Sequence, residues 1–249
     1  MNRLIRAEIL KLRTTPLLAW MAVCAAATVV ISVAGSILGA GHHGVPSLDS
    51  AAGVRNVIAS AGSADLAVLI VGILMMTGEF RHGTITSTFL VTPTRSVVVA
   101  AKLVTSALVG LAFGVAASLV SLAVALPWLH VKHVSVAFWS RDVGLVIVGA
   151  VVAAALYGAI GTSVGSLVRN QVAAVTGALG WVMVVEALVV NLLPDVGRWL
   201  PGGASAPLVG NSIPKGDLLP MWAGALVFGA YALVLVGTGS RFVVRRDVS

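Results

Sequence analysis

The stretch from residue 17 to residue 39, LLAWMAVCAAATVVISVAGSILG, contains no charged side chain along its whole length. An α-helix rises about 1.5 Å per residue, so about 20 apolar residues cross the roughly 30 Å hydrocarbon core of a bilayer. The run is too long for the apolar core of a signal peptide and lacks a convincing small-residue cleavage site. It therefore predicts a transmembrane helix that stays in the protein.

The composition of the whole chain supports the same conclusion. Of its 249 residues, 58% are hydrophobic and 10% are charged, and the mean hydropathy is +1.02. A soluble domain of this length cannot bury so much apolar surface in one core, and about a quarter of its residues would be charged. The net charge of +7 comes from basic residues beside apolar runs, which indicates lipid head groups as the anionic partner rather than nucleic acid.

Five further stretches have the length and apolarity of membrane spans: residues 57–77, 97–126, 143–164, 172–193 and 219–239. The stretch 97–126 is long enough to tilt or to project from the bilayer. The strongly apolar part of the stretch 57–77 covers only about 18 Å as a helix, so Asp65 must be drawn into the membrane. The sequence predicts an all-α integral membrane protein with six transmembrane helices in a single domain over residues 1–249.

The distribution of basic residues predicts the orientation of these helices. When alternate connections are assigned to one side, that side receives eleven of the 16 basic residues: Arg3, Arg6, Lys11, Arg13, Arg81, Arg95, Lys102, Arg169, Arg241, Arg245 and Arg246. The other side receives five, namely Arg55, Lys132, Arg141, Arg198 and Lys215. The positive-inside rule then places both termini in the cytoplasm of a multi-pass protein of the cell membrane.

The first sixteen residues mix apolar and basic side chains in the manner of a helix lying in the inner membrane interface. Two residues do not fit this pattern, because Glu8 falls within the apolar arc and Leu10 falls among the arginines. The alternative is a charged tail that only sets topology. We predict an interfacial amphipathic helix over residues 1–16.

The segment 194–220 is predicted to lie outside the cytoplasm and to form no ordinary long helix. It contains Pro201, Pro207 and Pro214 together with several glycines. Two structures suit this composition: an exposed loop, or a short hairpin that dips into the outer leaflet with its backbone groups buried in protein. The sequence does not decide between them.

The second cytoplasmic connection, GEFRHGTITSTFLVTPTR at residues 78–95, is the most informative motif of the chain, and Lys102 follows it in the next span. It resembles the corresponding loop of type-2 ABC transporter permeases, which has an acidic-aromatic-basic start, a Gly-Thr pair and a Thr-Pro-Thr-Arg close before a lysine. The stretch EILKLRTT at residues 8–15 is similar to the entry segment of that family. With the six-span order, the resemblance covers essentially the whole chain.

The resemblance implies the permease subunit of an ABC transporter, which pairs with a second copy or a paralogue and exports an amphipathic or hydrophobic substrate. It implies a coupling helix over residues 79–92 that docks on a separate cytoplasmic ATPase, and this partner would carry ATP and Mg²⁺. The residues expected at or near the ATPase contact are Glu79, Phe80, Arg81, His82, Gly83, Thr84 and Phe89. An aromatic anchor and an arginine suit such a contact, whereas the alternative is an interfacial helix that touches only lipid heads.

The chain itself shows no signature of catalysis or metal binding. It lacks the phosphate-binding sequence G-x-x-x-x-G-K-[ST], so we expect it to be no ATPase and to hold no cofactor. It also lacks a Ser-His-Asp order and an H-E-x-x-H motif. The adjacent His42 and His43 do not converge readily on one metal ion, and Cys24 is the only cysteine. No catalytic residue and no metal site are predicted.

Two acids, Asp65 and Glu186, lie inside apolar spans. A charge at the bilayer centre costs about 2.5 to 3.5 kcal/mol on insertion scales, so each acid is expected to face protein or water, or to be protonated. Each forms either a substrate or proton site or a polar contact between helices. In the resembled family the first and fifth spans form the dimer seam, which makes Gly35, Gly39 and Gly177 candidates for that contact.

Two other functions remain open. The first is an ion-coupled secondary transporter or channel that uses Asp65 and Glu186 in a proton path. The second is a membrane protein that anchors or regulates an ATPase and transports nothing.

Overall fold

The computed structural model describes residues 1–42, 45–84, 94–134, 141–211 and 217–245, and every regular element within these ranges is helical. The α-helices are α1 (Asn2–Thr14), α2 (Pro16–Leu38), α3 (Ala51–Ala59), α4 (Asp65–Arg81), α6 (Arg95–Val131), α7 (Arg141–Leu167), α8 (Gln171–Gly180), α9 (Ala187–Leu192), α10 (Pro194–Gly197), α11 (Pro201–Val209) and α12 (Met221–Arg245). A 3₁₀ turn, η1 (Ser60–Ala64), joins α3 to α4, and a π-helical segment, η2 (Trp181–Glu186), joins α8 to α9.

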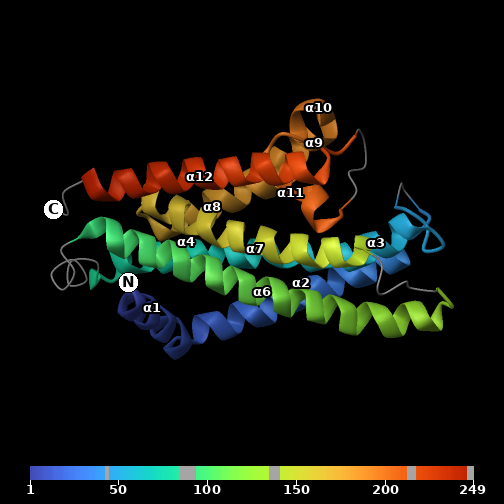
Figure 1. Ribbon diagram of the computed structural model, residues 1–249, viewed down its shortest axis with the longest axis horizontal. Helices are drawn as coiled ribbons and strands as arrows, with labels where there is room; N and C mark the ends of the chain where they lie inside the picture. Colours follow the sequence, from blue (N-terminus) through green and yellow to red (C-terminus); the bar gives the residue numbers. More distant parts are fainter. Residues whose placement is uncertain (43–44, 85–93, 135–140, 212–216, 246–249) are drawn as a thin grey trace.

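Six helical stretches are long and apolar enough to cross a membrane: Pro16–Leu38, Ala51–Arg81, Ser96–Val131, Arg141–Leu167, Gln171–Leu192 and Met221–Phe242. The predicted all-α class and the predicted number of spans are thereby confirmed. The long helices run roughly parallel to the long axis of the molecule. The helix α1 lies at the same end as the C-terminal end of α12 (Figure 1). We call this the terminal end, and the other, near α3, the distal end.

The centre of the bundle is built from α4, α6 and α7, whose backbones approach closely at glycines. A methyl group added at Gly72 in α4 would overlap the carbonyl oxygen of Gly158 in α7, and one at Gly165 would lie 2.7 Å from the carbonyl oxygen of Ile73. On α6, Gly114 faces Val151 of α7 in the same way, at 2.8 Å. Such small residues permit the close helix packing that is typical of membrane bundles.

The second span begins earlier than the sequence predicted and is broken in its middle. It starts at Ala51 rather than Val57, and the small residues of η1 interrupt the α-helix directly before Asp65. Neighbouring hydroxyl groups satisfy backbone groups near this break: Ser121 of α6 donates to the carbonyl oxygen of Ile58. The break is therefore buried in protein, as irregular backbone inside a membrane must be.

The peripheral spans α2, α8 with η2, and α12 expose long apolar surfaces. Large hydrophobic side chains on these spans with more than half of their surface exposed include Trp20, Val23, Ile31, Leu38, Val172, Met183, Leu188, Leu226, Leu233 and Val234. In water such a surface would favour aggregation, whereas lipid tails solvate it without cost. The exposed apolar surface therefore fits the membrane environment that the composition predicts.

The proline-rich segment after α9 is folded back onto the bundle. Its helix α11 begins at Pro201, packs against α7 and α12, and buries Ala204, Leu208 and Val209 almost completely. Gly210 ends α11 in a left-handed conformation with a φ of +80°. Residues 201–209 therefore form a helix packed on the bundle rather than an exposed loop.

Candidate functional site

Four charged side chains at the terminal end form a closed network, which we call the charge cluster: Glu8, Lys11, Glu79 and Lys102. The Lys102 ammonium lies 2.7 Å from Glu8 Oε2 and 2.8 Å from Glu79 Oε1. The Lys11 ammonium lies 2.8 Å from Glu79 Oε1 and 3.0 Å from Glu8 Oε1. Two carboxylates and two ammonium groups thus balance their charges and tie α1, α4 and α6 together.

The depth of the charge cluster differs between its two lysines. The Lys102 side chain is 1% exposed, whereas that of Lys11 is 51% exposed. Burial lowers the pKa of the Lys11 ammonium, but its hydrogen bonds to Glu79 and Glu8 outweigh this effect and leave the pKa raised. Lys11 therefore stays charged at neutral pH, and its stabilising contribution is lost only as the pH rises through that raised pKa.

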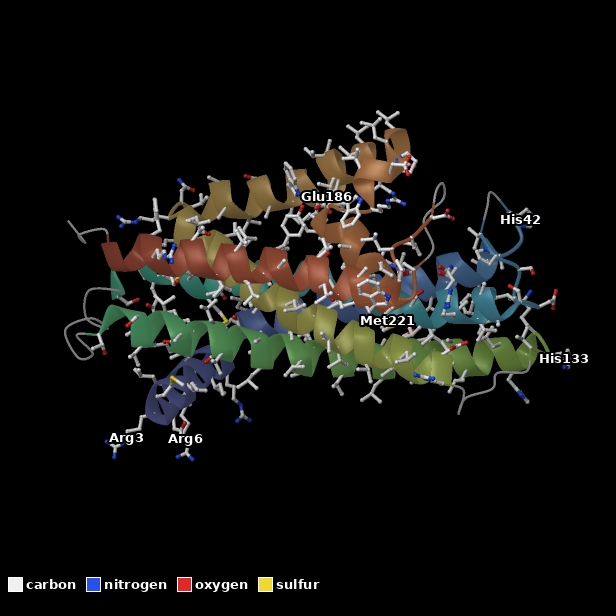
Figure 2. All side chains as sticks on the ribbon, turned by 45° about the horizontal axis from the view of Figure 1, so that its top comes forward. Arg3, Arg6, His42, His133, Glu186 and Met221 are labelled. Carbon is white, nitrogen blue, oxygen red and sulfur yellow. The ribbon has the colours of Figure 1, made fainter. Side chains whose placement is uncertain are left out.

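The charge cluster explains the two residues of α1 that did not fit an amphipathic pattern. Glu8 is buried because it binds Lys102, and Leu10 is 63% exposed on the opposite side of α1. Arg3 and Arg6 point away from the bundle (Figure 2). The acid in the apolar arc of α1 therefore has a structural role: Glu8 binds Lys102 and attaches α1 to α6.

The residues predicted to contact the ATPase fall into a buried residue, Glu79, and an exposed group that follows it. The side chain of Glu79 is 8% exposed and belongs to the charge cluster, whereas Arg81, His82, Gly83 and Thr84 are exposed at the terminal end. Gly83, two residues after the end of α4, has a φ of +66°, which suits glycine. Residues 85–93, which include Phe89 and most of the predicted coupling helix, lie outside the described residues.

The last turn of α4 also contacts the link between α7 and α8. The guanidinium carbon of Arg169 lies 5.3 Å from the centre of the Phe80 ring, within the range of a cation–π interaction. Arg81 Nη1 donates to Gln171 Oε1 at 3.3 Å. The start of the second connection is thus fixed to α7 and α8 as well as to the charge cluster.

Within the bundle, Glu186 accepts two hydrogen bonds from elements that the π-helical turn brings within reach. The indole nitrogen of Trp181 donates to its Oε1 at 3.0 Å, and the backbone nitrogen of Gly202 donates to its Oε2 at 2.9 Å. A π-helix closes its turns between residues i and i+5, which aligns Trp181 with Glu186 on one side of η2. The Gly202 amide belongs to the first turn of α11, so the carboxylate also faces the positive end of that helix dipole.

A second hydrogen-bonded group connects α11 to α7. Ser205 Oγ donates to the carbonyl oxygen of Gly202 at 2.9 Å, so the Tyr157 hydroxyl, 3.1 Å away, donates to Ser205. Asp65 and Glu186 both lie within electrostatic reach of Tyr157. The structure therefore brings the two intramembrane acids of the sequence to the surroundings of one buried tyrosine.

Next to these groups lies a cavity of about 250 Å³ that we call the Glu186 cavity. Its lining comes from α4, α7, α8, η2, α11 and α12 and is apolar apart from Glu186 and the polar edges of Tyr157 and Trp181. Glu186 is directed towards the neighbouring helices rather than away from the bundle (Figure 2). Trp181 is 46% exposed, so the cavity lies close to the lipid-facing surface.

We expect Tyr157→Phe to lower the free energy of unfolding by about 1 kcal/mol, because it removes one buried hydrogen bond and leaves the ring in place. Ser205→Ala should cost a similar amount, and the double variant should cost less than the sum of the two. Unfolding in mixed micelles of the three variants measures the coupling. Strict additivity would show that the bond between α7 and α11 contributes nothing to stability.

The dimer-seam candidates remain on open faces of the chain. A side chain added at Gly35 or Gly177 would meet no atom within 4 Å of its Cβ, and both glycines are exposed. Gly39 is half-buried beside the loop that follows α2. Gly35 and Gly177 are thus accessible to a second chain, and the role of all three glycines in a dimer stays a prediction.

Sequence reasoning missed the partners of each acid. Glu8 and Lys102 carried a signal, since both are charged residues inside otherwise apolar patterns, and opposite charges in such places pair. No such signal marks Tyr157, Trp181 or Gly202 in the sequence. Their roles arise from hydrogen bonds that form only when the chain is folded. Within the described ranges no group of three or more His, Cys, Asp or Glu side chains gathers to hold a metal ion.

Comparison with known proteins leaves the fold and the two sites as the basis for any function. No protein-family model matches this chain, and no curated protein matches it in sequence.

Proposed function

We propose that this protein is the membrane-spanning permease subunit of an ABC transporter that exports an amphipathic or hydrophobic substrate across the cell membrane. Two permease chains, either copies or paralogues, form the translocation path, and a separate cytoplasmic ATPase supplies ATP and Mg²⁺. The termini and the connection at residues 82–94 face the cytoplasm. The resemblance of residues 78–95 and 8–15 to type-2 permeases supports this function, together with six membrane-spanning helices.

The observation that carries the proposal is the junction between the charge cluster and the second connection. The connection leaves α4 two residues after Glu79 and enters α6 seven residues before Lys102, so both of its ends are anchored by the same ion pairs. A movement of this connection would therefore displace α1, α4 and α6 together, because ion pairs join the three helices. Such a rigid attachment suits a two-state movement driven by a partner that binds ATP.

On this proposal Glu79 and the exposed residues after it have different roles. Arg81 and His82 meet the ATPase, with Phe89 as the aromatic anchor, while Glu79 positions the connection through Lys11 and Lys102. Interface energy is usually concentrated in a few aromatic and arginine side chains. The loss of either Arg81 or Phe89 should therefore weaken capture of the ATPase far more than the loss of a neighbour.

Pull-down of the tagged chain from its native membrane, followed by mass spectrometry, tests the proposal. A cytoplasmic ATPase should accompany the chain in stoichiometric amount. Arg81→Glu and Phe89→Ala should each reduce this capture about tenfold or more. Gln171→Ala is the matched control, because it removes the same hydrogen bond to Arg81 without reversing the charge, and it should capture the ATPase normally.

Unchanged capture by both Arg81→Glu and Phe89→Ala would overturn the coupling assignment. Reproducible absence of any ATPase from the intact, folded chain would overturn the ABC function itself. The ion-coupled alternative would then gain weight, since Glu186 lines a cavity and both Asp65 and Glu186 lie within electrostatic reach of Tyr157. It predicts that Asp65→Asn and Glu186→Gln abolish transport while removal of ATPases has no effect.

A further inference from the structure

We infer that the Glu186 cavity binds a lipophilic cation: a small ammonium compound, or the ammonium end of a larger amphiphile, whose charge pairs with the Glu186 carboxylate. The inference rests on the proposed function for its meaning, because in a transporter such a site holds substrate. Its first support is the charge of the cavity. Within the described ranges, Glu186 is 4% exposed, takes part in no ion pair, and shares the cavity with no basic side chain.

The hydrogen bonds of Glu186 leave part of its acceptor capacity unused. Trp181 and Gly202 each donate one hydrogen bond, and neither brings a full positive charge. A carboxylate offers about four acceptor positions, so about two remain for a ligand. Buried charges in proteins are normally paired, and a cation is the partner that this carboxylate lacks.

The other residues that line the cavity favour a ligand with a hydrocarbon part beside its charged group. Leu69, Ile160, Val182 and Leu235 present hydrocarbon surface, and the Trp181 ring adds an aromatic surface that favours ammonium groups. Ligand sites of this kind combine an apolar wall with a few polar groups that fix orientation. A volume of about 250 Å³ accommodates a small ligand, which suits an ammonium group with a short hydrocarbon body.

The local backbone keeps the carboxylate in this position. The π-helical segment η2 sets Trp181 beside Glu186, and π-helical turns occur frequently at functional sites. Gly177, one α-helical turn before Trp181, contributes no side chain to the lining and leaves open space at its Cβ position. The absence of a side chain there leaves room between the cavity and the lipid-facing surface of α8.

Photolabelling of the purified chain in nanodiscs tests the site directly. The probes are an octylamine and an octanol that carry the same diazirine on the same carbon, so they differ only in the head group, which is a cation in the amine and neutral in the alcohol at neutral pH. Mass spectrometry maps the labelled residues. The amine should label the peptide around residues 177–186 about tenfold more than the alcohol, because only the amine can form an ion pair with Glu186.

Three variants make the outcome specific. Glu186→Gln should reduce amine labelling to the level of the alcohol while leaving alcohol labelling unchanged, which also shows that the cavity remains folded. Gly177→Leu should suppress labelling by both probes, because its side chain fills the cavity. Gly180→Leu is the control: it lies on the same helix, also has open space at Cβ, does not line the cavity, and should change neither.

Equal labelling by amine and alcohol in the unmodified chain would overturn the inference, as would amine labelling that survives Glu186→Gln. If Glu186→Gln prevents folding, the ratio of amine to alcohol labelling in the unmodified chain, together with the two glycine variants, still tests whether the cavity binds a cation. The experiment uses the permease chain without an ATPase. If labelling succeeds but no ATPase is captured, the proposed function is overturned and the cation site is kept. If an ATPase is captured but labelling fails, the cation site is overturned and the proposed function is kept.

Discussion

Replacement of Lys102 by methionine is expected to lower the free energy of unfolding by about 3 to 5 kcal/mol, the cost of leaving a buried carboxylate without its partner. Lys102 is 1% exposed and contacts both Glu8 and Glu79, so its loss leaves two buried acids that share the single ammonium group of Lys11 within the charge cluster. Lys11 compensates little, because half of its side chain lies in solvent. Unfolding of the chain by denaturing detergent in mixed micelles measures the difference.

Two further variants make this experiment decisive. Lys132→Met removes an exposed lysine at the distal end of the same helix and should change the free energy of unfolding by at most about 0.5 kcal/mol. Adding Glu79→Gln to Lys102→Met should recover part of the loss, because one uncompensated charge disappears. If Lys102→Met unfolds at the same detergent fraction as Lys132→Met, the charge cluster does not stabilise the terminal end.

The second large effect is expected at Gly72, where α4 crosses α7. Even the single methyl group of Gly72→Ala would overlap the carbonyl oxygen of Gly158 and lie 2.9 Å from the backbone nitrogen of Thr162. Neither atom belongs to a movable side chain, so the helices must separate. Overpacking of this kind costs about 1 to 3 kcal/mol, and the larger Gly72→Leu should prevent assembly of the bundle.

The matched control lies in the same helix. A side chain at Gly78 meets no atom within 4 Å, so Gly78→Ala should be neutral or should stabilise α4 by up to about 1 kcal/mol through its better helix propensity. Gly35→Ala tests the same point on α2. Unfolding of these single variants provides the comparison, and equal stability of Gly72→Ala and Gly78→Ala would contradict the close crossing of α4 and α7.

The spans were predictable because a bilayer imposes one length and one polarity on every helix that crosses it. The apolar run after Pro16 therefore located α2 within one residue at each end. The start of the second span was not predictable to that accuracy. Arg55 and Asn56 lie within the helix at its distal end, where polar side chains carry no penalty, so hydropathy could not mark the boundary.

The candidate sites were predictable only as single residues. Asp65 and Glu186 are conspicuous as acids in apolar runs, but their distance from Tyr157 depends on how α4, α7 and η2 pack. The π-helical turn at Trp181 leaves no trace in hydropathy, because all of its residues before Glu186 are apolar. Contacts between residues distant in the chain follow from packing geometry, and one sequence alone does not encode that geometry in a readable pattern.

The charge cluster also has a consequence for the order of events during synthesis. Lys102 is separated from Glu8 by 94 residues, which a ribosome takes about 5 to 20 s to translate. Glu79 precedes Lys102 by 23 residues, so both acids are synthesised before the lysine. The helix α6 therefore packs against α1 and α4 after both counter-ions of Lys102, the most deeply buried charge of the cluster, have been synthesised.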